Sequence, residues 1–431
     1  MPFKIFNTLS RKKEVFRPRR GEKVNLFVCG ITPYDFTHLG HARTYIVFDM
    51  ITKYLREKGY NVFYLQNITD VEDRILERAK KEKISWKNLS RKFEREYLKD
   101  MKSLHIDSVA KYARATDHIK EIINQIKKLE KKGFAYQIQD GIYYDISKFK
   151  EYGKLSKRTV LQAEDAVSRI DESKEKRNRG DFCLWKFSPR LRSGQAKPTE
   201  PSWQSPWGSG RPGWHIEDTA ITEKFFGPQY DIHGGARDLI FPHHEAEIAQ
   251  MEAVSGKKPL VKYWLHAGFL TVKGQKMAKS LGNFVTIQDF LKNYSPRLLR
   301  FFVLKSHYRS PIDYSEKLIL QTKRELERID EFVNKLQRKF PITNVKFQNN
   351  FKFKIRNLKF TFERAMEDDF NTPRALASIF RLINRGNQLL DKGKLTSADA
   401  RDILEFLKKI DKIFNFIFWG KPKKEKIPAP I

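Results

Sequence analysis

A short apolar run followed by a helical pattern opens the chain. Residues 24–28 (VNLFV) form a β-rich apolar run, and residues 42–55 carry apolar side chains at the spacing of one helix face. Gly30 and Pro33 interrupt the pattern between them. This order of strand, turn and helix, with further alternation to about residue 115, predicts the first half of a Rossmann-type parallel nucleotide-binding sheet.

The pattern changes in the middle of the chain. Residues 116–202 begin with a helical pattern, continue through a β-like segment at 141–144 (GIYY), and end in a loop rich in proline, glycine and serine. We interpret them as an insertion, after which the sheet resumes near residue 203.

The last part of the chain is helical and charged from about residue 311. Residues 322–336 and 373–390 carry apolar side chains three and four apart, which predicts a helical bundle with that stripe as its core. The predicted fold class is therefore α/β: a Rossmann-type parallel sheet with an inserted connective domain, followed by a C-terminal α-helical bundle.

The turn after the first strand carries the most informative chemistry. It reads CGITPYDFTHLGH (29–41) and places His38 and His41 at the start of the helix. A helix N-terminus presents free N–H groups and a positive dipole end, and two imidazoles add hydrogen-bond donors for phosphate. Gly40 lets a nucleotide approach the backbone closely. We predict a phosphate-binding turn; the alternative is that the histidines only cap the helix.

A second basic element lies far downstream, at residues 276–283 (KMAKSLGN). Gly274 precedes the two lysines and Gly282 follows them, so Lys276 and Lys279 are expected on a loop that can close over a ligand. Mobile cations suit a triphosphate whose charge shifts as pyrophosphate leaves. Because a lysine pair in so basic a chain can simply be a solvated loop, the hypothesis of an ATP-using adenylation site depends on both elements together.

These elements resemble those of a known family. HLGH (38–41) and KMAKS (276–280) are similar to the two signatures of class I aminoacyl-tRNA synthetases, and their context resembles cysteinyl-tRNA synthetase. The resemblance extends from the N-terminus to about residue 384. Five further blocks carry it: NITDVED (67–73), GRPGWHIE (210–217), DIHGG (231–235), FPHHEAE (241–247) and HYRS (307–310).

The resemblance implies a cysteine–tRNA ligase. Such an enzyme activates L-cysteine with ATP and Mg²⁺ to cysteinyl adenylate, and then transfers cysteine to the 3′ end of tRNA(Cys), releasing AMP and pyrophosphate. The catalytic residues implied are His38, His41, Lys276 and Lys279. The ATP-binding residues implied are these four with Gly40 and Asp238, and the cysteine-binding residues are Thr69 and Trp214.

The family also holds a zinc ion in the amino-acid pocket, bound by two cysteines, a histidine and a glutamate. Cys29, His243 and Glu247 match three of these ligands, and the last two are four apart, on one helix face. Asp218 stands where the family has its second cysteine. A carboxylate can ligate zinc, so the expected ligands of one zinc per chain are Cys29, Asp218, His243 and Glu247. The alternative is that Asp218 faces away and the metal is three-coordinate or absent.

A thiolate-binding metal gives this site its expected selectivity. Serine and cysteine differ by one atom, and a metal favours a thiol over an alcohol of much higher pKa, so no editing domain is expected. Because oxygen donors give the metal less charge than thiolates do, we also expect a more Lewis-acidic zinc and broader tolerance of other divalent ions.

The expected segments follow from pattern and resemblance. The two halves of the catalytic domain are 1–115 and 203–265, and the insertion that contacts the acceptor end, 116–202, lies between them. The signature-loop and stem-contact region (266–310), the tRNA-binding bundle (311–420) and a short basic tail (421–431) follow. No small anticodon-reading domain is expected in that tail. Three explanations remain open: tRNA selection by the acceptor end and bundle, a separate polypeptide, or an incomplete reading frame.

Composition agrees with a nucleic-acid partner. The chain has 84 basic and 52 acidic residues, a net charge of +32, which favours a polyanion. It has two cysteines, and we interpret Cys183 as a buried core thiol, so no disulfide is expected. The sequence contains no recognisable signal peptide and no long apolar run, which predicts a cytoplasmic protein without membrane contact. We expect a monomer.

Two other functions fit much of this pattern. A ligase of the mycothiol pathway type uses the same fold, zinc and adenylate but passes cysteine to an amino sugar. A non-catalytic tRNA-binding paralogue would keep the scaffold without the chemistry. HYRS (307–310) and DYSE (313–316) favour the synthetase over the sugar ligase, and the intact signatures argue against loss of chemistry.

Overall fold

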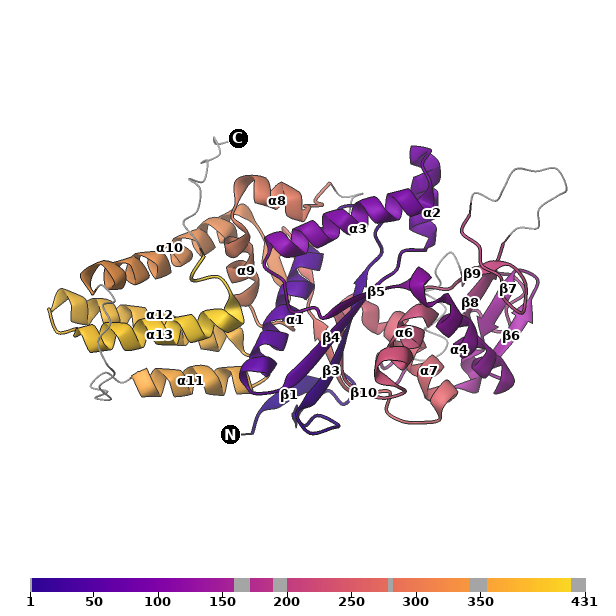
Figure 1. Cartoon of the computed structure of the whole chain (residues 1–431), viewed down its shortest axis with the longest axis horizontal. Helices are drawn as coiled ribbons and strands as arrows, with labels where there is room; N and C mark the ends of the chain where they lie inside the picture. The colour runs from indigo at the N-terminus through magenta and orange to yellow at the C-terminus, as the bar shows by residue number, and fades with distance from the viewer. Residues whose placement is uncertain (1, 159–170, 189–199, 278–281, 341–354, 420–431) are drawn as a thin grey trace.

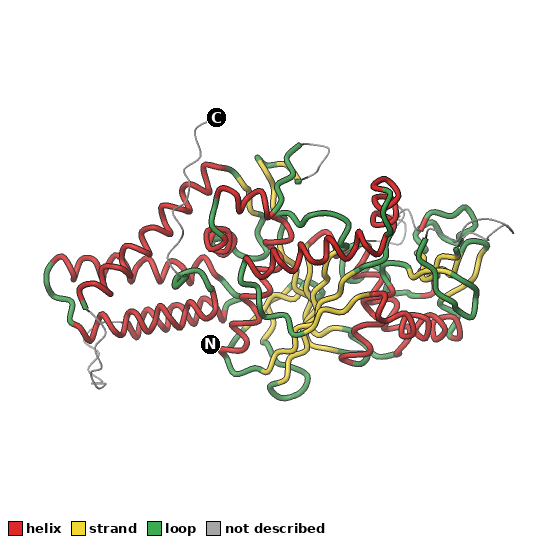
Figure 2. Tube along the Cα trace, turned by 45° about the horizontal axis from the view of Figure 1, so that its top comes forward, coloured by secondary structure: helices red, strands yellow, loops and turns green. Residues whose placement is uncertain are grey.

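A five-stranded parallel sheet lies at the centre of the molecule (Figures 1 and 2). The computed structural model describes residues 2–158, 171–188, 200–277, 282–340 and 355–419. The strand order is β11-β10-β3-β4-β5, and each neighbouring pair is parallel. The bounds are β3 (Lys23–Ile31), β4 (Asn61–Ile68), β5 (Lys111–Arg114), β10 (Tyr230–Ala236) and β11 (Val261–Ala267). The predicted Rossmann-type sheet, interrupted and then resumed, is confirmed.

Both faces of this sheet are buried, as expected for parallel strands. Along β3, Val24, Leu26 and Val28 belong to one apolar core, which they share with α1 (Leu39–Glu57) and the C-terminal helices. Phe27 and Cys29 alternate to the other face and pack in a second core. That second core includes residues of α4 (Ile119–Lys131), α6 (Ile216–Phe226) and α7 (His243–Ser255). Cys29 therefore faces α6 and α7, which carry the other predicted metal ligands.

The insertion forms its own antiparallel sheet at one end of the molecule (Figure 1). Its strand order is β6-β7-β8-β9, with bounds Ala135–Ile138, Gly141–Tyr144, Phe182–Phe187 and Gly210–Pro212. The last strand comes after residue 202, where we expect the insertion to end, so the chain completes the inserted sheet before it returns to the central one. Cys183 is fully buried in this sheet and free, as interpreted from sequence.

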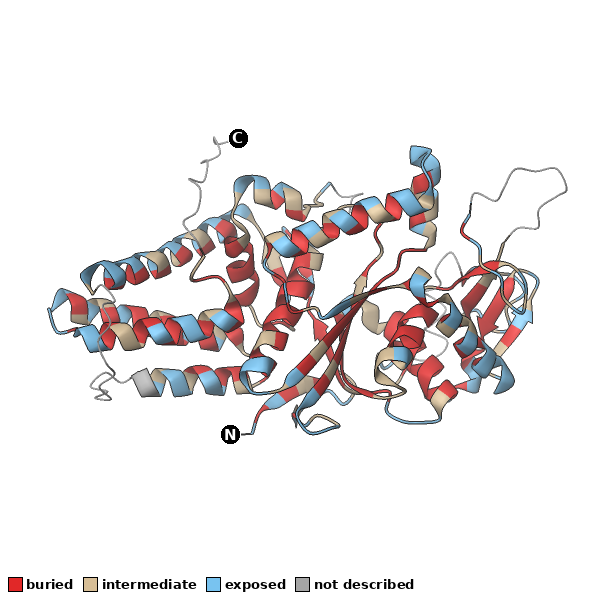
Figure 3. Ribbon diagram, viewed as in Figure 1, coloured by how far each residue is buried: buried red, intermediate tan, exposed pale blue. Residues whose placement is uncertain are grey.

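Helices form the opposite end of the molecule (Figure 1). They are α9 (Pro296–Leu304), α10 (Glu316–Lys339), α11 (Ile355–Glu367), α12 (Thr372–Asp391) and α13 (Ser397–Phe414). Their buried residues face inward and their polar residues outward (Figure 3). The predicted bundle with an apolar stripe as its core is confirmed.

Shorter elements complete the architecture. The helices α2 (Asp73–Glu82) and α3 (Trp86–Ser103) lie between β4 and β5 in sequence, and α3 crosses above these strands (Figure 1). The remaining strands and helices are β1 (Lys4–Asn7), β2 (Lys12–Val15), η1 (Ala115–His118), η2 (Ile146–Lys148), η5 (Arg237–Ile240), β12 (Leu270–Val272), β13 (Gln275–Lys276), α8 (Ile287–Asn293) and β14 (Ile312–Tyr314). Among the described helices, none is both long enough and apolar enough to span a lipid bilayer.

A buried ion pair links helix α9 of the bundle to helix α1, which packs against the central sheet. Asp49 on α1 accepts a hydrogen bond from Arg300 of α9 at 2.7 Å, and both side chains are fully buried. Ser108 donates to the same carboxylate at 2.7 Å, and Lys53 lies 3.0 Å away. Burial alone would raise the pKa of Asp49, but Arg300, Lys53 and Ser108 outweigh it and lower that pKa.

We expect Arg300→Met to lower the free energy of unfolding by up to about 3–5 kcal/mol at pH 7, because it removes the buried guanidinium partner of Asp49 and leaves that carboxylate with only Lys53 and Ser108. A folded-state pKa below the unfolded value means that the pair stabilises the protein above the ordinary carboxyl pKa and that this stability is lost as the pH falls through the folded-state pKa. The difference in free energy of unfolding between the variant and the wild type, measured by urea unfolding, should therefore become smaller in acid. Arg338→Met, at an exposed position, is the matched control; equal unfolding of both variants would contradict the assignment.

Candidate active site and metal centre

The predicted metal ligands meet where the strand order of the sheet reverses, between β3 and β10. In open parallel sheets, ligands bind outside the carboxyl ends of the strands at such a point. Cys29 lies near the carboxyl end of β3, Asp218 on the first turn of α6, and His243 and Glu247 one turn apart on α7. All four side chains are buried. The structure thus brings together the four residues that the sequence predicts as ligands.

Their donor atoms form a compact cluster. His243 Nε2 lies 3.0 Å from both Asp218 Oδ2 and Glu247 Oε1. Cys29 Sγ lies 3.6 Å from Asp218 Oδ2 and 3.8 Å from Glu247 Oε1. Zinc bond lengths give a tetrahedron with edges of about 3.3 Å between nitrogen and oxygen donors and about 3.5 Å to sulfur. These four separations are close to such edges, all the donor atoms lie within 4.8 Å of one another, and Asp218 faces the cluster rather than away.

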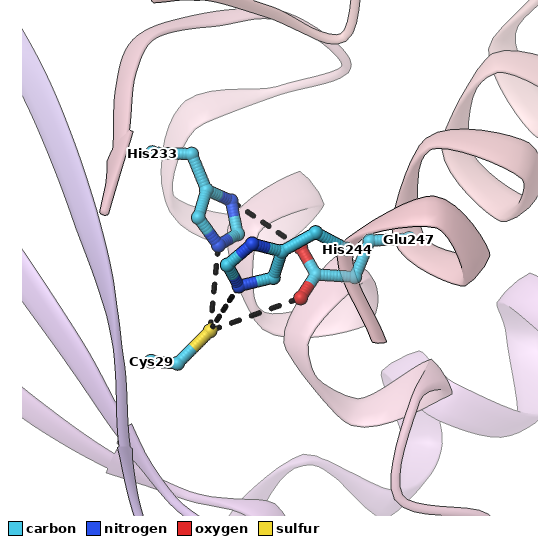
Figure 4. A group of neighbouring side chains, drawn as sticks. All are labelled: Cys29, His233, His244 and Glu247. Carbon is cyan, nitrogen blue, oxygen red and sulfur yellow. Dashed lines mark hydrogen bonds and ion pairs between the residues drawn. The ribbon is translucent and has the colours of Figure 1, made fainter. Parts of the chain in front are cut away.

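A second group of donors surrounds the same thiol (Figure 4). His233 on β10 and His244 on α7 place their Nε2 atoms 3.4 Å and 3.1 Å from Cys29 Sγ. His233 Nδ1 also lies 3.3 Å from Glu247 Oε2. Cys29 and Glu247 therefore belong to two possible ligand sets, one completed by Asp218 and His243 and the other by His233 and His244.

The chemistry of both sets fits a divalent cation. Burying the acidic groups of Cys29, Asp218 and Glu247 together without a cation is costly. In each set, one histidine also hydrogen-bonds a neighbouring histidine through its other ring nitrogen, an outer contact that can orient a metal ligand. His243 shares a hydrogen bond with His215 at 2.8 Å, and His244 shares one with His266 at 2.8 Å. The set with Asp218 offers one more negative charge than the set with His233 and His244. In the latter set, Cys29 Sγ and His244 Nε2 are 3.1 Å apart, which is shorter than the edge of about 3.5 Å expected at zinc. Both points favour the set with Asp218.

An amide and a hydroxyl order the acidic residues beside this cluster. Asn67, at the carboxyl end of β4, donates to Asp218 Oδ1 and leaves Oδ2 directed at Cys29 and His243. It also donates to Thr69 at 3.3 Å, and the Thr69 hydroxyl donates to Glu217. Thr69 is thus buried beside the cluster, and its predicted role in cysteine binding stays a prediction.

Protons compete with a metal at this cluster. Burial, together with the charges of Glu247 and Asp218, raises the pKa of the Cys29 thiol. Burial alone would lower the pKa of His243, but the two carboxylates raise it to about 10. Zinc ligands must be deprotonated, so binding a metal releases protons and its affinity rises with pH.

Trp214 forms one wall of the cluster. Its ring stacks on His243, with centroids 4.5 Å apart and planes 3° from parallel, and lies 3.9 Å from the centroid of His215. An aromatic plane in this position can cover the side chain of a small substrate held at the metal. The predicted role of Trp214 in cysteine binding is consistent with this contact and stays a prediction.

The predicted phosphate-binding turn starts α1. His38 Nδ1 accepts a hydrogen bond from Gly40 N–H at 3.0 Å, and His41 Nδ1 accepts one from His38 N–H at 3.2 Å. The hydrogen-bond pattern assigns the proton of each neutral ring to Nε2. Burial lowers the pKa of His38 to about 4, and burial with the nearby His38 lowers that of His41. Both histidines do cap the helix, and each also keeps an Nε2–H that can donate to phosphate.

Residues that follow the second signature contact this turn through their backbone. Lys276 lies in β13, which pairs with β12, and Thr286, beyond residues 278–281 that the structure does not describe, forms a β-bridge with His38. Leu39 N–H also donates to Val285 O at 3.1 Å. The side chain of Lys276 and all of Lys279 lie outside the described residues.

Asp238 is the last of the predicted ATP-binding residues. It lies exposed in η5, directly after β10, at the same edge of the sheet as the metal cluster. Its position suits a contact with the adenylate, and that role stays a prediction.

Sequence reasoning missed three residues around the cluster: His233, His244 and Asn67. Each occurs in a block that carries the family resemblance, DIHGG, FPHHEAE or NITDVED. The blocks could have suggested their importance, but only the fold places them next to Cys29 Sγ or Asp218.

Comparisons with known proteins define the class. The family model described as the tRNA synthetases class I (C) catalytic domain matches residues 15–324, and the DALR domain model matches residues 361–418. Two solved synthetases share the fold. Mycobacterium tuberculosis methionyl-tRNA synthetase has a TM-score of 0.67 at 15% identity, covering 91% of this chain and 92% of that one. The Agrobacterium radiobacter K84 leucyl enzyme has a TM-score of 0.69 at 11% identity, covering 92% and 84%. The family model therefore identifies the chain as a class I tRNA synthetase, and the two solved structures share its fold.

Curated relatives narrow the class further. Cysteine–tRNA ligases of Thermococcus onnurineus and Methanococcus maripaludis are each 46% identical, over 96% and 95% of this chain and 86% of theirs. The enzyme of Carboxydothermus hydrogenoformans is 44% identical, over 96% of this chain and 87% of its own. The chain belongs to the cysteine–tRNA ligase family.

The two ligand sets can be separated by substitution. If Asp218 binds zinc, Asp218→Asn should lower zinc affinity by more than about 100-fold, whereas His244→Gln, which removes a neighbour of the Cys29 thiol but no ligand, should lower it by at most about 10- to 100-fold. Asp218→Cys should restore binding and strengthen the sulfur-to-metal charge-transfer absorption of the cobalt-substituted protein, because a second thiolate is added. Zinc titration against a competing chelator measures the affinities. The reverse pattern, with His244→Gln defective and Asp218→Asn normal, would assign the metal to the set with His233 and His244.

Proposed function

We propose that the chain joins L-cysteine to tRNA(Cys) in two steps that use ATP. The observation that carries the proposal is the thiolate, carboxylate and imidazole cluster at the switch point of the sheet, combined with the two Nε2–H donors at the start of α1. The first can select a thiol, and the second can bind phosphate. Their combination fits activation of cysteine by ATP.

Cys29, Asp218, His243 and Glu247 would hold the metal, with His233 and His244 next to it. When bound, zinc would supply a Lewis-acidic site that prefers the thiolate of cysteine to the hydroxyl of serine. Thr69 and Trp214 would position the rest of the amino acid.

In the first step, the cysteine carboxylate attacks the α-phosphorus of ATP in line and pyrophosphate leaves. His38 and His41 would donate from Nε2 to phosphate oxygens whose charge changes in the transition state, with Gly40 allowing close approach. We assign Lys276 and Lys279 to the pyrophosphate side, Asp238 to the adenylate and Mg²⁺ to ATP. In the second step, a terminal ribose hydroxyl of tRNA takes the aminoacyl group and AMP leaves. Positioning and electrostatics supply most of the catalysis, and no covalent intermediate with the protein is needed.

The partners are therefore tRNA(Cys), ATP and L-cysteine. We propose that the enzyme acts in the cytoplasm as a monomer, and that the segments predicted at 116–202 and 311–420 contact the acceptor end and the stem of tRNA. The net charge of +32 favours such contacts.

Charging of full-length tRNA(Cys) with labelled cysteine, in the presence of ATP, Mg²⁺ and zinc, tests the proposal. Charging that requires both ATP and the tRNA would support it. Cysteine-dependent pyrophosphate exchange without charging, together with transfer to an amino sugar, would instead indicate the amino-sugar ligase. Absence of both reactions in a folded, zinc-loaded protein would indicate the non-catalytic paralogue.

A further inference from the structure

A separate cavity lies beside the cysteine pocket, and the mechanism does not use it. Its volume is about 360 Å³, near the lower end of the range for ligand sites. It lies between the start of α3, η1 and the segment before β9. The lining residues on which the argument depends are Trp86, Ser90, Arg91, Asp70, Thr116 and Trp203.

Two half-buried indole rings form its apolar part. The centroids of Trp86 and Trp203 are 6.2 Å apart and their planes are inclined by 68°, so the rings meet edge to face. Trp86 is the first residue of α3, and Trp203 is fixed by paired backbone hydrogen bonds with Gly210. Indole faces of this kind are the usual platforms for an unstacked nucleobase.

The polar groups of the cavity suit one nucleotide. Arg91 supplies a cation, which is held 2.7 Å from Glu94 and 3.6 Å from Asp70. Lys87, exposed at the rim, supplies another. Asp70 also accepts hydrogen bonds from the Thr116 amide and hydroxyl, which fixes its position. Lys87 and Arg91 give the lining two positive charges, and Asp70 and Asp117 give it two negative ones. This balance suits a single phosphate with base and ribose donors and opposes a triphosphate.

A buried hydroxyl without a partner points to a missing ligand. Ser90 lines the cavity and is 1% exposed, yet its Oγ has no hydrogen-bond partner among the described residues. Buried polar groups are normally paired, so such an atom requires an explanation. A base edge or ribose hydroxyl in the cavity would supply the partner.

The cavity adjoins the site of chemistry. Asp70 directly follows Thr69, whose hydroxyl donates to Glu217 beside the metal cluster. An RNA strand whose terminal ribose reaches the cysteine pocket would bring its preceding nucleotides close to Asp70 and the cavity that it lines. We propose that the cavity binds one unpaired nucleotide near the 3′ end of the acceptor strand, stacked on Trp86 and hydrogen-bonded to Ser90. This assignment builds on the proposed function and adds a position and a chemistry for one tRNA contact.

Two substitutions test the contact without touching the metal or ATP sites. Trp86→Ala removes the stacking surface and should lower kcat/KM for tRNA charging by about 10- to 100-fold, while Trp86→Phe keeps most of it. Ser90→Ala removes an unpaired buried hydroxyl, so it should not destabilise the fold, and it should lower the same constant about 5- to 10-fold. Cysteine-dependent pyrophosphate exchange, which needs no tRNA, should stay within about twofold in each variant. Lys99→Ala on the same helix, outside the cavity, is the control.

A binding measurement covers the case in which charging fails for another reason. The probe is a tRNA(Cys) transcript with 2-aminopurine at one unpaired acceptor-end position at a time. One position should be quenched on binding to wild type and not to Trp86→Ala. Unchanged charging and quenching in both Trp86→Ala and Ser90→Ala would overturn the assignment. A raised KM for ATP in exchange would overturn it in favour of a free nucleotide. A wild type that binds the probe with Trp86-dependent quenching but never charges would reject the proposed function and keep the cavity assignment.

Discussion

Cys29→Ala is expected to abolish stoichiometric zinc binding and, with it, cysteine-dependent pyrophosphate exchange. Cys29 is the one thiol in both possible ligand sets, with donors of four other residues 3.1–3.8 Å from its sulfur. Loss of a group that only orients a ligand already costs about 10- to 100-fold in metal affinity, so loss of the ligand should cost more than about 100-fold. Metal analysis after dialysis against chelator-buffered zinc gives the affinity, and exchange kinetics give the loss of activation.

The chain provides its own control for this experiment. Cys183 is also buried and free, but it lies in the inserted sheet beside Tyr143. Cys183→Ala should keep zinc and exchange activity, and its cobalt-substituted form should keep the sulfur-to-metal absorption that Cys29→Ala loses. Full zinc occupancy in Cys29→Ala would show that the thiol is no ligand, whichever histidines complete the site.

The metal site shows how far sequence reasoning reaches. Cys29 and Asp218 are 189 positions apart, and only the family resemblance could join them, because spacing holds no information about which strands pair. His233 illustrates the limit. It pairs in register with Phe27 on β3, so it points to the same face of the sheet as Cys29. That register depends on the tertiary fold and cannot be read from the local pattern of DIHGG.

In the fold, the long elements could be predicted from the sequence, and the shortest strand could not. The helix predicted at 42–55 is observed as Leu39–Glu57, and the strand predicted at 24–28 as Lys23–Ile31, because both have a sustained apolar period. By contrast, β9 has three residues, a glycine and a proline among them. It pairs with β8 of the inserted sheet, although the sequence predicts that the insertion ends at residue 202, before β9 begins. Such a strand is stabilised by its neighbours rather than by its own sequence.

Removing either imidazole at the start of α1 should slow the activation of cysteine. His38→Ala and His41→Ala each delete one neutral Nε2–H donor, and loss of one such donor costs about 10²–10³ in kcat. Burial lowers the pKa of His38 to about 4, so its ring stays neutral above that value. Its donor is then present throughout the neutral range, and the rate of pyrophosphate exchange should show no step from this group between pH 6 and 8. Exchange kinetics at saturating ATP and cysteine measure both effects.

One substitution separates phosphate binding from capping at His38. Asparagine is among the best N-cap residues, so His38→Asn can accept the Gly40 N–H that the ring accepts now, while its shorter side chain cannot place a donor where Nε2–H lies. Helix stability in this variant should stay near that of the wild type, whereas His38→Ala should lose about 1 kcal/mol. If His38→Asn kept full exchange activity, capping would be the whole role of this histidine. If exchange fell as far in His38→Asn as in His38→Ala while the fold stayed intact, the ring would be acting on the substrate. We expect the second result, because the ring nitrogen that faces the backbone is occupied by the cap and the other is free to bind phosphate.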